Sequence, residues 1–277
     1  MARLVYVAQE FDLALYGAVD IGWTDDTGAR SISDISTGIY RHATSAADFL
    51  THPSSTLMST TTIANTTRPS FGATLQALMD AATAQTPTVT YSNDTNRYTL
   101  ACNGAVFSVT WSGAAQLLMR KLLGFTGNLS GATSYTATAA PFFTLEPRKN
   151  AFTEPKALAA VTEAVSRRRT SGGSLTRMGP VVLPHGVSWR FEQEADSATL
   201  DEFAVSPGYT WQSFFNDSAR HGRRCYFVDY GPPVGSTQRW VFQLMSDGFD
   251  SGTHRRTVAN LRDRWTIDVE ANVIGRY

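Results

Sequence analysis

The stretch Arg264-Trp265-Thr266-Ile267-Asp268-Val269-Glu270-Ala271-Asn272-Val273 decides the fold class of the C-terminal part of this chain. Every odd position carries an apolar side chain and every even position a polar one. Strict alternation of this kind is typical of an antiparallel strand that has one face on a core and the other in water. These residues therefore predict a long strand in an antiparallel sheet.

The segments before this strand repeat its pattern over shorter lengths. One strand is predicted around Trp189, and two more over 225–230 and 240–245. Residues 196–221 predict a helix interrupted at Pro207-Gly208, and Gly222 follows as its stop. Together they predict an antiparallel β-sandwich or part-barrel with a flanking helix in residues 147–277.

Residues 157–168 predict a further helix, which ends in Arg167-Arg168-Arg169 and is followed by a flexible break at 171–174. Clustered guanidinium groups can neutralise nucleic-acid phosphates. The partial negative charge at the end of a helix also favours cations there. We favour the second interpretation, a solvated helix end.

The first part of the chain mixes hairpins with amphipathic helices, and residues 1–146 predict an α+β domain. Helices are expected over 45–50, 71–82 and 114–123, the last closed by Gly124 in a left-handed conformation. Strands are expected over 11–16, 88–91, 98–102 and 106–111, and a turn at Asp25-Asp26-Thr27-Gly28.

Charge separates the same two parts. The chain of 277 residues has 24 basic and 24 acidic residues; residues 1–146 hold seven and ten of them, and residues 147–277 hold 17 and 14. We therefore expect two domains, 1–146 and 147–277, in an α+β protein. The neutral total argues against a dedicated nucleic-acid binder. No apolar run is long enough to predict a membrane span or a secretion signal, so we expect the protein to be made inside the cell. Cys102 and Cys225 are expected to be buried free thiols.

The residues that could carry chemistry form no familiar catalytic motif. The sequence has no phosphate-binding loop, zinc-binding His pair, Cys-x-x-Cys or nucleophile elbow, and its five histidines are scattered. We expect no enzyme, no metal site and no cofactor. A cluster of charged residues near the C-terminus has two open interpretations, as contacts between subunits or as solvated surface. Its members are Arg255, Arg256, Arg262 and Arg264, with Asp268 and Glu270 in the strand that follows.

Two runs in the first part resemble virion structural proteins of tailed bacteriophages. They are Val106-Phe107-Ser108-Val109-Thr110-Trp111 and Leu117-Leu118-Met119-Arg120-Lys121-Leu122-Leu123-Gly124-Phe125-Thr126-Gly127. The second part is similar, in the order of its elements, to the tail-tube-like modules of phage tails.

This resemblance implies a structural protein at the distal end of a phage tail, made in the host cytoplasm. Its subunits would form a homo-oligomeric ring, often sixfold, that joins the tail tube to the tail-hub or baseplate proteins. DNA would pass through the central channel without sequence readout, and no catalytic residue carries over. Tube proteins stack through a long hairpin, which the sequence does not predict unless residues 246–260 serve. A single ring is therefore expected rather than a stacked tube.

Three alternatives stay open at this point. A receptor- or carbohydrate-binding tail module would use exposed aromatic side chains of residues 1–146. An unrecognised enzyme would need histidines that converge in one pocket. A tube, connector or decoration protein would differ only in its position in the virion.

Overall fold

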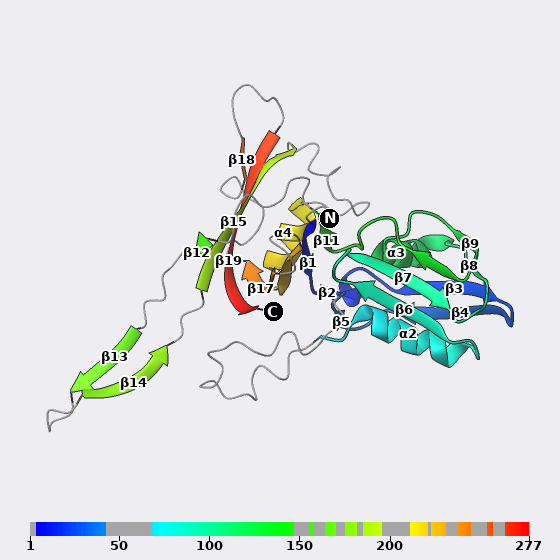
Figure 1. Ribbon diagram of the computed structural model, residues 1–277, viewed down its shortest axis with the longest axis horizontal. Helices are drawn as coiled ribbons and strands as arrows, with labels where there is room; N and C mark the ends of the chain where they lie inside the picture. The colour runs from blue at the N-terminus through cyan, green and yellow to red at the C-terminus, as the bar shows by residue number, and fades with distance from the viewer. Residues whose placement is uncertain are drawn as a thin grey trace.

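The structure is a computed structural model. It describes residues 4–42, 68–146, 156–157, 164–169, 175–181, 185–195, 211–220, 223–230, 238–244, 254–256 and 264–276. These residues form a mixed α+β fold in which all paired strands run antiparallel (Figure 1). The predicted α+β class is confirmed at this level.

The largest sheet has eight strands, which follow the order β11-β1-β16-β17-β19-β15-β12, with β18 also paired to β19. The long strand expected from the alternating C-terminal stretch is confirmed as β19, a strand of 13 residues at the centre of these pairings. The bounds of the eight strands are β1 Leu4–Gln9, β11 Thr144–Leu145, β12 Lys156–Ala157, β15 His185–Ala195, β16 Cys225–Tyr230, β17 Gln238–Leu244, β18 His254–Arg256 and β19 Arg264–Arg276.

This sheet takes strands from both parts of the chain. Leu4 pairs with Tyr230 and Gln9 with Cys225, so β1 lies beside β16 along its whole length. Val7 also pairs with Leu145 of β11 on the other edge of β1. The start of the chain therefore belongs to the same sheet as its end, and the boundary predicted near residue 146 stays a prediction.

Three smaller sheets and two helices make up most of the described residues between 10 and 143. The four-stranded sheet has the order β4-β3-β8-β9, the three-stranded sheet the order β10-β7-β6, and β2 pairs with β5. Helix α2 packs on β6 and β4, and helix α3 packs on β3. The bounds are β2 Phe11–Asp12, β3 Val19–Asp25, β4 Gly28–Ile35, β5 Ile39–Tyr40, α2 Phe71–Ala82, β6 Pro87–Ser92, β7 Arg97–Cys102, β8 Phe107–Val109, α3 Gly113–Leu123, β9 Leu129–Ala132 and β10 Ser134–Thr136.

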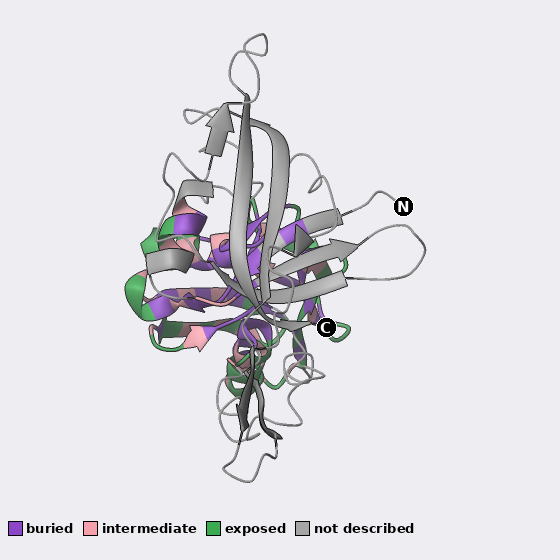
Figure 2. Cartoon of the chain, turned by 90° about the vertical axis from the view of Figure 1, so that its left-hand side faces the viewer, coloured by how far each residue is buried: buried purple, intermediate pink, exposed green. Residues whose placement is uncertain are grey.

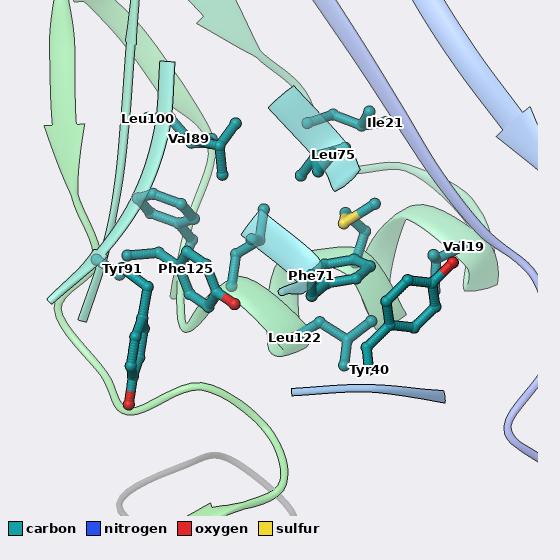
Figure 3. Packing of buried hydrophobic residues seen from close by; sticks show 14 of the residues in the cluster. Val19, Ile21, Tyr40, Phe71, Leu75, Val89, Tyr91, Leu100, Leu122 and Phe125 are labelled. Carbon is teal, nitrogen blue, oxygen red and sulfur yellow. The ribbon is translucent and has the colours of Figure 1, made fainter. Parts of the chain in front are cut away.

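The predicted amphipathic helix over 71–82 is confirmed as α2. Phe71, Leu75 and Met79 recur at helical spacing and are at most 2% exposed. Figure 2 shows buried residues gathered in the interior of this region and exposed residues around its rim. Figure 3 shows the side chains of α2 in the same cluster as those of β3 and β6. Since burying one such side chain contributes about 1.5–3 kcal/mol, this face of α2 holds the helix on the sheets.

The expected end of α3 is also confirmed. Gly124 has φ +78°, its N–H donates to the Lys121 carbonyl at 3.0 Å, and the Phe125 N–H donates to the Arg120 carbonyl at 3.0 Å. This pair of bonds is the Schellman arrangement, which satisfies carbonyls that the helix leaves open. A residue with little steric restriction at positive φ is needed there, and glycine meets that need.

Helix α4 (Trp211–Arg220) confirms the second part of the helix predicted over 196–221, and 196–210 lies outside the described residues. Phe214 and Phe215 of this helix are fully buried and belong to the same hydrophobic cluster as Phe71 and Phe143. Cys102 and Cys225 are both buried free thiols, as expected. The core therefore continues from the small sheets to α4.

Two expectations were wrong. The alternating residues 11–16 form a strand only as far as Asp12, because the Asp12 carboxylate accepts a hydrogen bond from the Ala14 N–H and begins a 3-10 helix, Leu13–Leu15. In the helix predicted over 157–168, the described residues are extended instead. Ala157 ends β12, and residues from Ala164 onward form β13 (Ala164–Arg169), which pairs with β14 (Leu175–Val181). The helix predicted over 45–50 lies outside the described residues.

Candidate assembly interface

The charged residues expected to contact a neighbouring subunit lie around the first half of β19. The alternation of the strand places Arg264, Thr266, Asp268 and Glu270 on one face of the sheet. The pairing of β19 with β15 is regular along Asp268 and Glu270, since the bulge between the two strands lies nearer their ends. One polar face of the eight-stranded sheet thus carries three of these charged residues, Arg264, Asp268 and Glu270.

Strand β15 adds a basic residue to this face. Arg190 stands directly opposite Asp268, and Ser188 stands opposite Glu270. Opposite charges at facing positions of an antiparallel pair stabilise the sheet by about 0.2–1 kcal/mol. Of the two acidic positions in the predicted cluster, Asp268 therefore already has an arginine opposite it in its own chain, and Glu270 has a serine.

The arginine pair before β19 is divided between the two faces. In the pairing of β18 with β19, Arg255 is opposite Thr266 and Arg256 is opposite Trp265. Arg255 consequently shares the polar face with Arg264, and Arg256 lies on the other face. Arg262 lies outside the described residues. The structure thus groups Arg255, Arg264, Asp268 and Glu270, and their role between subunits stays a prediction.

Among the described strands, both ends of the eight-stranded sheet are covered only in part. At one end, β11 pairs with two residues of the six-residue strand β1, and at the other β12 pairs with two residues of the 11-residue strand β15. Among the described strands, nothing else pairs with the outer edges of β1 and β15. Unpaired strand edges of this kind are templates for pairing with another chain.

The hairpin β13–β14 was missed by the sequence interpretation. Its strands pair only with each other among the described strands, and Figure 1 shows them standing away from the rest of the chain. The signal was present in Ser171-Gly172-Gly173-Ser174, because Gly-Gly between two extended runs is typical of a hairpin. The sequence pattern alone predicts a flexible break after a helix there.

One histidine, His42, has surroundings that the structure describes in full, and its contacts stabilise the fold. His42 is 1% exposed, its Nε2 lies 2.7 Å from the Phe142 carbonyl oxygen, and its Nδ1 lies 2.8 Å from the Tyr98 hydroxyl. Because a carbonyl only accepts, Nε2 carries the proton and Nδ1 accepts from Tyr98. Burial lowers the pKa of His42 to about 4, although the bond to Phe142 opposes that change. A neutral imidazole therefore joins two distant segments inside the core.

A second buried polar cluster holds the end of the first part in place. Glu146 forms a two-oxygen ion pair with Arg97, in which Nη2 lies 3.2 Å from Oε2. Asn96 donates to the same carboxylate at 2.9 Å and to the Thr144 hydroxyl at 3.2 Å, while Tyr91 donates to Asn96 at 2.7 Å. These bonds tie the turn between β6 and β7 to β11, which is the point where the chain enters the large sheet.

Neither cluster has the composition of a metal site. In the part of the chain that the structure describes, no three His, Cys, Asp or Glu side chains gather closely enough to hold a metal ion. No described helix combines the length and apolar character needed to cross a bilayer. Among the residues between 8 and 146 whose burial is described, the large hydrophobic side chains that are exposed are aliphatic: Leu15, Leu78, Val106 and Leu117. They give no support to an aromatic sugar-binding platform.

Comparisons of the chain with models of known protein families, with characterised proteins and with solved structures find no match.

Proposed function

We propose that this chain is a structural subunit of a bacteriophage tail that forms a homo-oligomeric ring at the distal end, around the DNA channel. The observation that carries the proposal is the eight-stranded antiparallel sheet, in which, among the described strands, the end strands β11 and β12 pair with only two residues each of β1 and β15. The two ends of the sheet are different strand edges, so one edge of a subunit can pair with the other edge of its neighbour in a head-to-tail interface. Such an interface forms a closed ring when the rotation between neighbouring subunits closes.

The proposed organisation has a peripheral α+β domain, 1–146, and a tail-tube-like ring domain, 147–277, that is a β-sandwich or part-barrel. Strands β1 and β11 would then be contributed across this boundary to the sheet of the ring domain. Because β1 pairs with β16 over six residues, this shared sheet would hold the two proposed domains together. The partners would be other copies of the chain, the tail tube and the tail-hub or baseplate proteins.

The hairpin β13–β14 favours a second position within the same class. The expectation of a single end ring depended on the lack of a stacking hairpin, and residues 164–181 now supply a two-stranded one that stands away from the sheet. A subunit of the tail tube itself is therefore the second candidate, since tube-like modules stack through such a hairpin.

Light scattering of the purified chain at several concentrations tests the assembly. We expect a mass near six times the 30.2 kDa of one chain, or three times for a trimer, and closed rings in negative-stain electron microscopy. Arg264→Glu and Arg255→Glu should shift the mass toward one chain if the polar face contacts a neighbour. Asp80→Asn, an exposed change on α2, serves as a control that should leave the mass unchanged. A chain that stays at 30.2 kDa and forms no rings at any concentration would contradict the proposal.

A further inference from the structure

The hairpin β13–β14 concentrates positive charge in a chain that is neutral as a whole. Residues 164–181 contain Arg167, Arg168, Arg169 and Arg177 and no Asp or Glu. With 24 basic and 24 acidic residues in total, the hairpin has a charge of +4 and the rest of the chain −4. The neutral total that argued against a nucleic-acid binder therefore conceals a strongly basic arm.

The strand register places these arginines on both faces of the ribbon. Arg167 stands opposite Arg177, and the two-residue period of a strand puts Arg169 on the same face. Arg168 stands opposite Thr176, which puts it on the other face. Like charges at facing positions destabilise a strand pair. The hairpin itself contains no acidic residue, so an anion that offsets this repulsion would come from outside it.

We propose that the β13–β14 hairpin binds double-stranded DNA through the phosphate backbone. The major groove of B-DNA admits a two-stranded β-ribbon, and its walls present phosphates to both faces of whatever enters it. A flat acidic protein surface would meet one face of the ribbon and leave the arginines of the other face in water. Guanidinium groups also match phosphate oxygens in a two-point geometry that a lysine does not offer.

This binding goes beyond the proposed assembly role and does not depend on it. Contacts to phosphate carry no sequence information and are strongly salt-dependent, because each neutralised phosphate releases condensed counterions. Four such contacts give a slope of about −3.6 for log K against log salt concentration, so affinity should fall roughly 100-fold between 50 and 200 mM salt.

The test is fluorescence anisotropy of a labelled 20-bp duplex with the full chain over this salt range. We expect binding that is indifferent to sequence and has the slope given above. Arg167→Gln with Arg177→Gln should lower the magnitude of the slope by about 2, and replacing all four arginines by Gln should abolish binding at 50 mM salt. Arg30→Gln with Lys121→Gln removes the same charge from β4 and α3 and should leave the slope unchanged.

A variant with lysine in place of Arg167, Arg168, Arg169 and Arg177 distinguishes a loss of binding caused by lost charge from one caused by a damaged hairpin. It keeps the +4 charge and should keep most of the affinity, since Lys also binds phosphate as a point charge. The melting temperature of every variant is followed by circular dichroism, and we expect no change because the hairpin pairs with no other described strand. Failure of the full chain to bind duplex at 50 mM salt would overturn the proposal. Equal losses in the two double variants would also overturn it. If the four-Gln variant loses its oligomers but keeps its DNA affinity, the hairpin binds a second copy of the chain and not DNA.

Discussion

Arg223 Nη2 lies 3.3 Å from Asp12 Oδ2, although 211 positions separate the two residues. The second oxygen of Asp12 accepts a hydrogen bond from the Ala14 N–H at 3.1 Å and caps the 3-10 helix. Both side chains are largely buried, 22% exposed for Asp12 and 12% for Arg223. One carboxylate therefore sets the turn after β2 and also the position at which the chain enters β16.

Asp12→Ala should lower the free energy of unfolding by about 2 kcal/mol, because it removes a hydrogen bond to a charged group and leaves Arg223 without its described partner. Arg223→Ala should cost a similar amount for the converse reason. The double variant should be less destabilised than the sum of the two, with a coupling of about 1 kcal/mol in urea unfolding. Strictly additive losses would show that the pair does not interact, and the exposed change Asp80→Asn should stay within about 0.5 kcal/mol of the original chain.

His42 predicts that the protein loses stability in mild acid. The ordinary pKa of 6.5 applies to the unfolded chain, whereas burial lowers the pKa in the folded protein to about 4. The unfolded state therefore binds more protons between these values, so stability falls as pH is lowered from 6.5 toward 4 and is constant above that window. Between pH 7 and 4.5 this residue should account for a loss of about 2 kcal/mol.

The measurement is urea unfolding from pH 7 to 4.5 for the original chain and for His42→Gln. The variant should start less stable, since His42 bonds both Tyr98 and Phe142, but its stability should decline less steeply with pH. Other titrating groups are shared by both proteins and cancel in the difference. Parallel pH profiles would mean that His42 is protonated in the folded state as readily as in the unfolded one.

Sequence patterns predicted the helix ends and strands that depend on interactions between neighbouring residues. The alternation at 264–273 predicted β19, and Gly124 marked the end of α3, because each feature is decided by neighbouring residues. The helix expected over 157–168 was wrong in its described residues for a related reason. Residues there have good helix propensity, but the pairing of β13 with β14 outweighs it.

Contacts between distant segments left no local signal. Nothing in the residues of β1 indicates that Leu4 pairs with Tyr230, and nothing near Asp12 points to Arg223. The candidate assembly surface was only partly predictable for the same reason. Its arginines and acids were visible in the sequence, whereas the placement of Arg190 opposite Asp268 depends on the register of two strands far apart in the chain.

The hydrogen bonds of Asp25 predict that this carboxylate contributes much more to stability than the adjacent carboxylate of Asp26. Its Oδ1 accepts from the Thr27 N–H at 2.8 Å, and its Oδ2 accepts from Trp23 Nε1 at 3.2 Å and from the Thr83 hydroxyl at 3.1 Å. Asp25→Ala leaves these donors without an acceptor and should cost about 3 kcal/mol in urea unfolding. Asp26→Ala removes a single exposed bond from Gln85 and should cost about 0.5 kcal/mol. Similar losses in the two variants would refute the structural role of Asp25.

The same carboxylate has a defined pH dependence. Burial alone would raise the pKa of Asp25, but the hydrogen bonds from Thr27, Thr83 and Trp23 outweigh it and lower the pKa below the ordinary 3.8. The stabilisation is therefore complete above pH 3.8 and is lost as pH falls through the lower folded value. Asp25→Asn should be less sensitive than the original chain to acid below about pH 4, measured by unfolding at pH 5 and pH 3.

The glycines at the two ends of α3, Gly113 and Gly124, allow the cost of backbone strain to be measured apart from the cost of a steric clash. Gly113 and Gly124 have nearly equal φ, +77° and +78°, so an alanine meets the same left-handed penalty of about 1–2 kcal/mol at either position. A Cβ at Gly113 would have nothing within 4 Å, but a Cβ at Gly124 would lie 2.3 Å from the Ala139 carbonyl oxygen. The Ala139 backbone cannot easily move away from the added Cβ, because the Ala139 N–H donates a hydrogen bond to the Gly124 carbonyl at 3.0 Å and holds the two backbones together. Gly124→Ala should therefore lower the free energy of unfolding by at least about 2 kcal/mol more than Gly113→Ala. Equal losses in thermal and urea unfolding would mean that the backbone at 139 moves aside, and the Schellman end of α3 would then be set by φ alone.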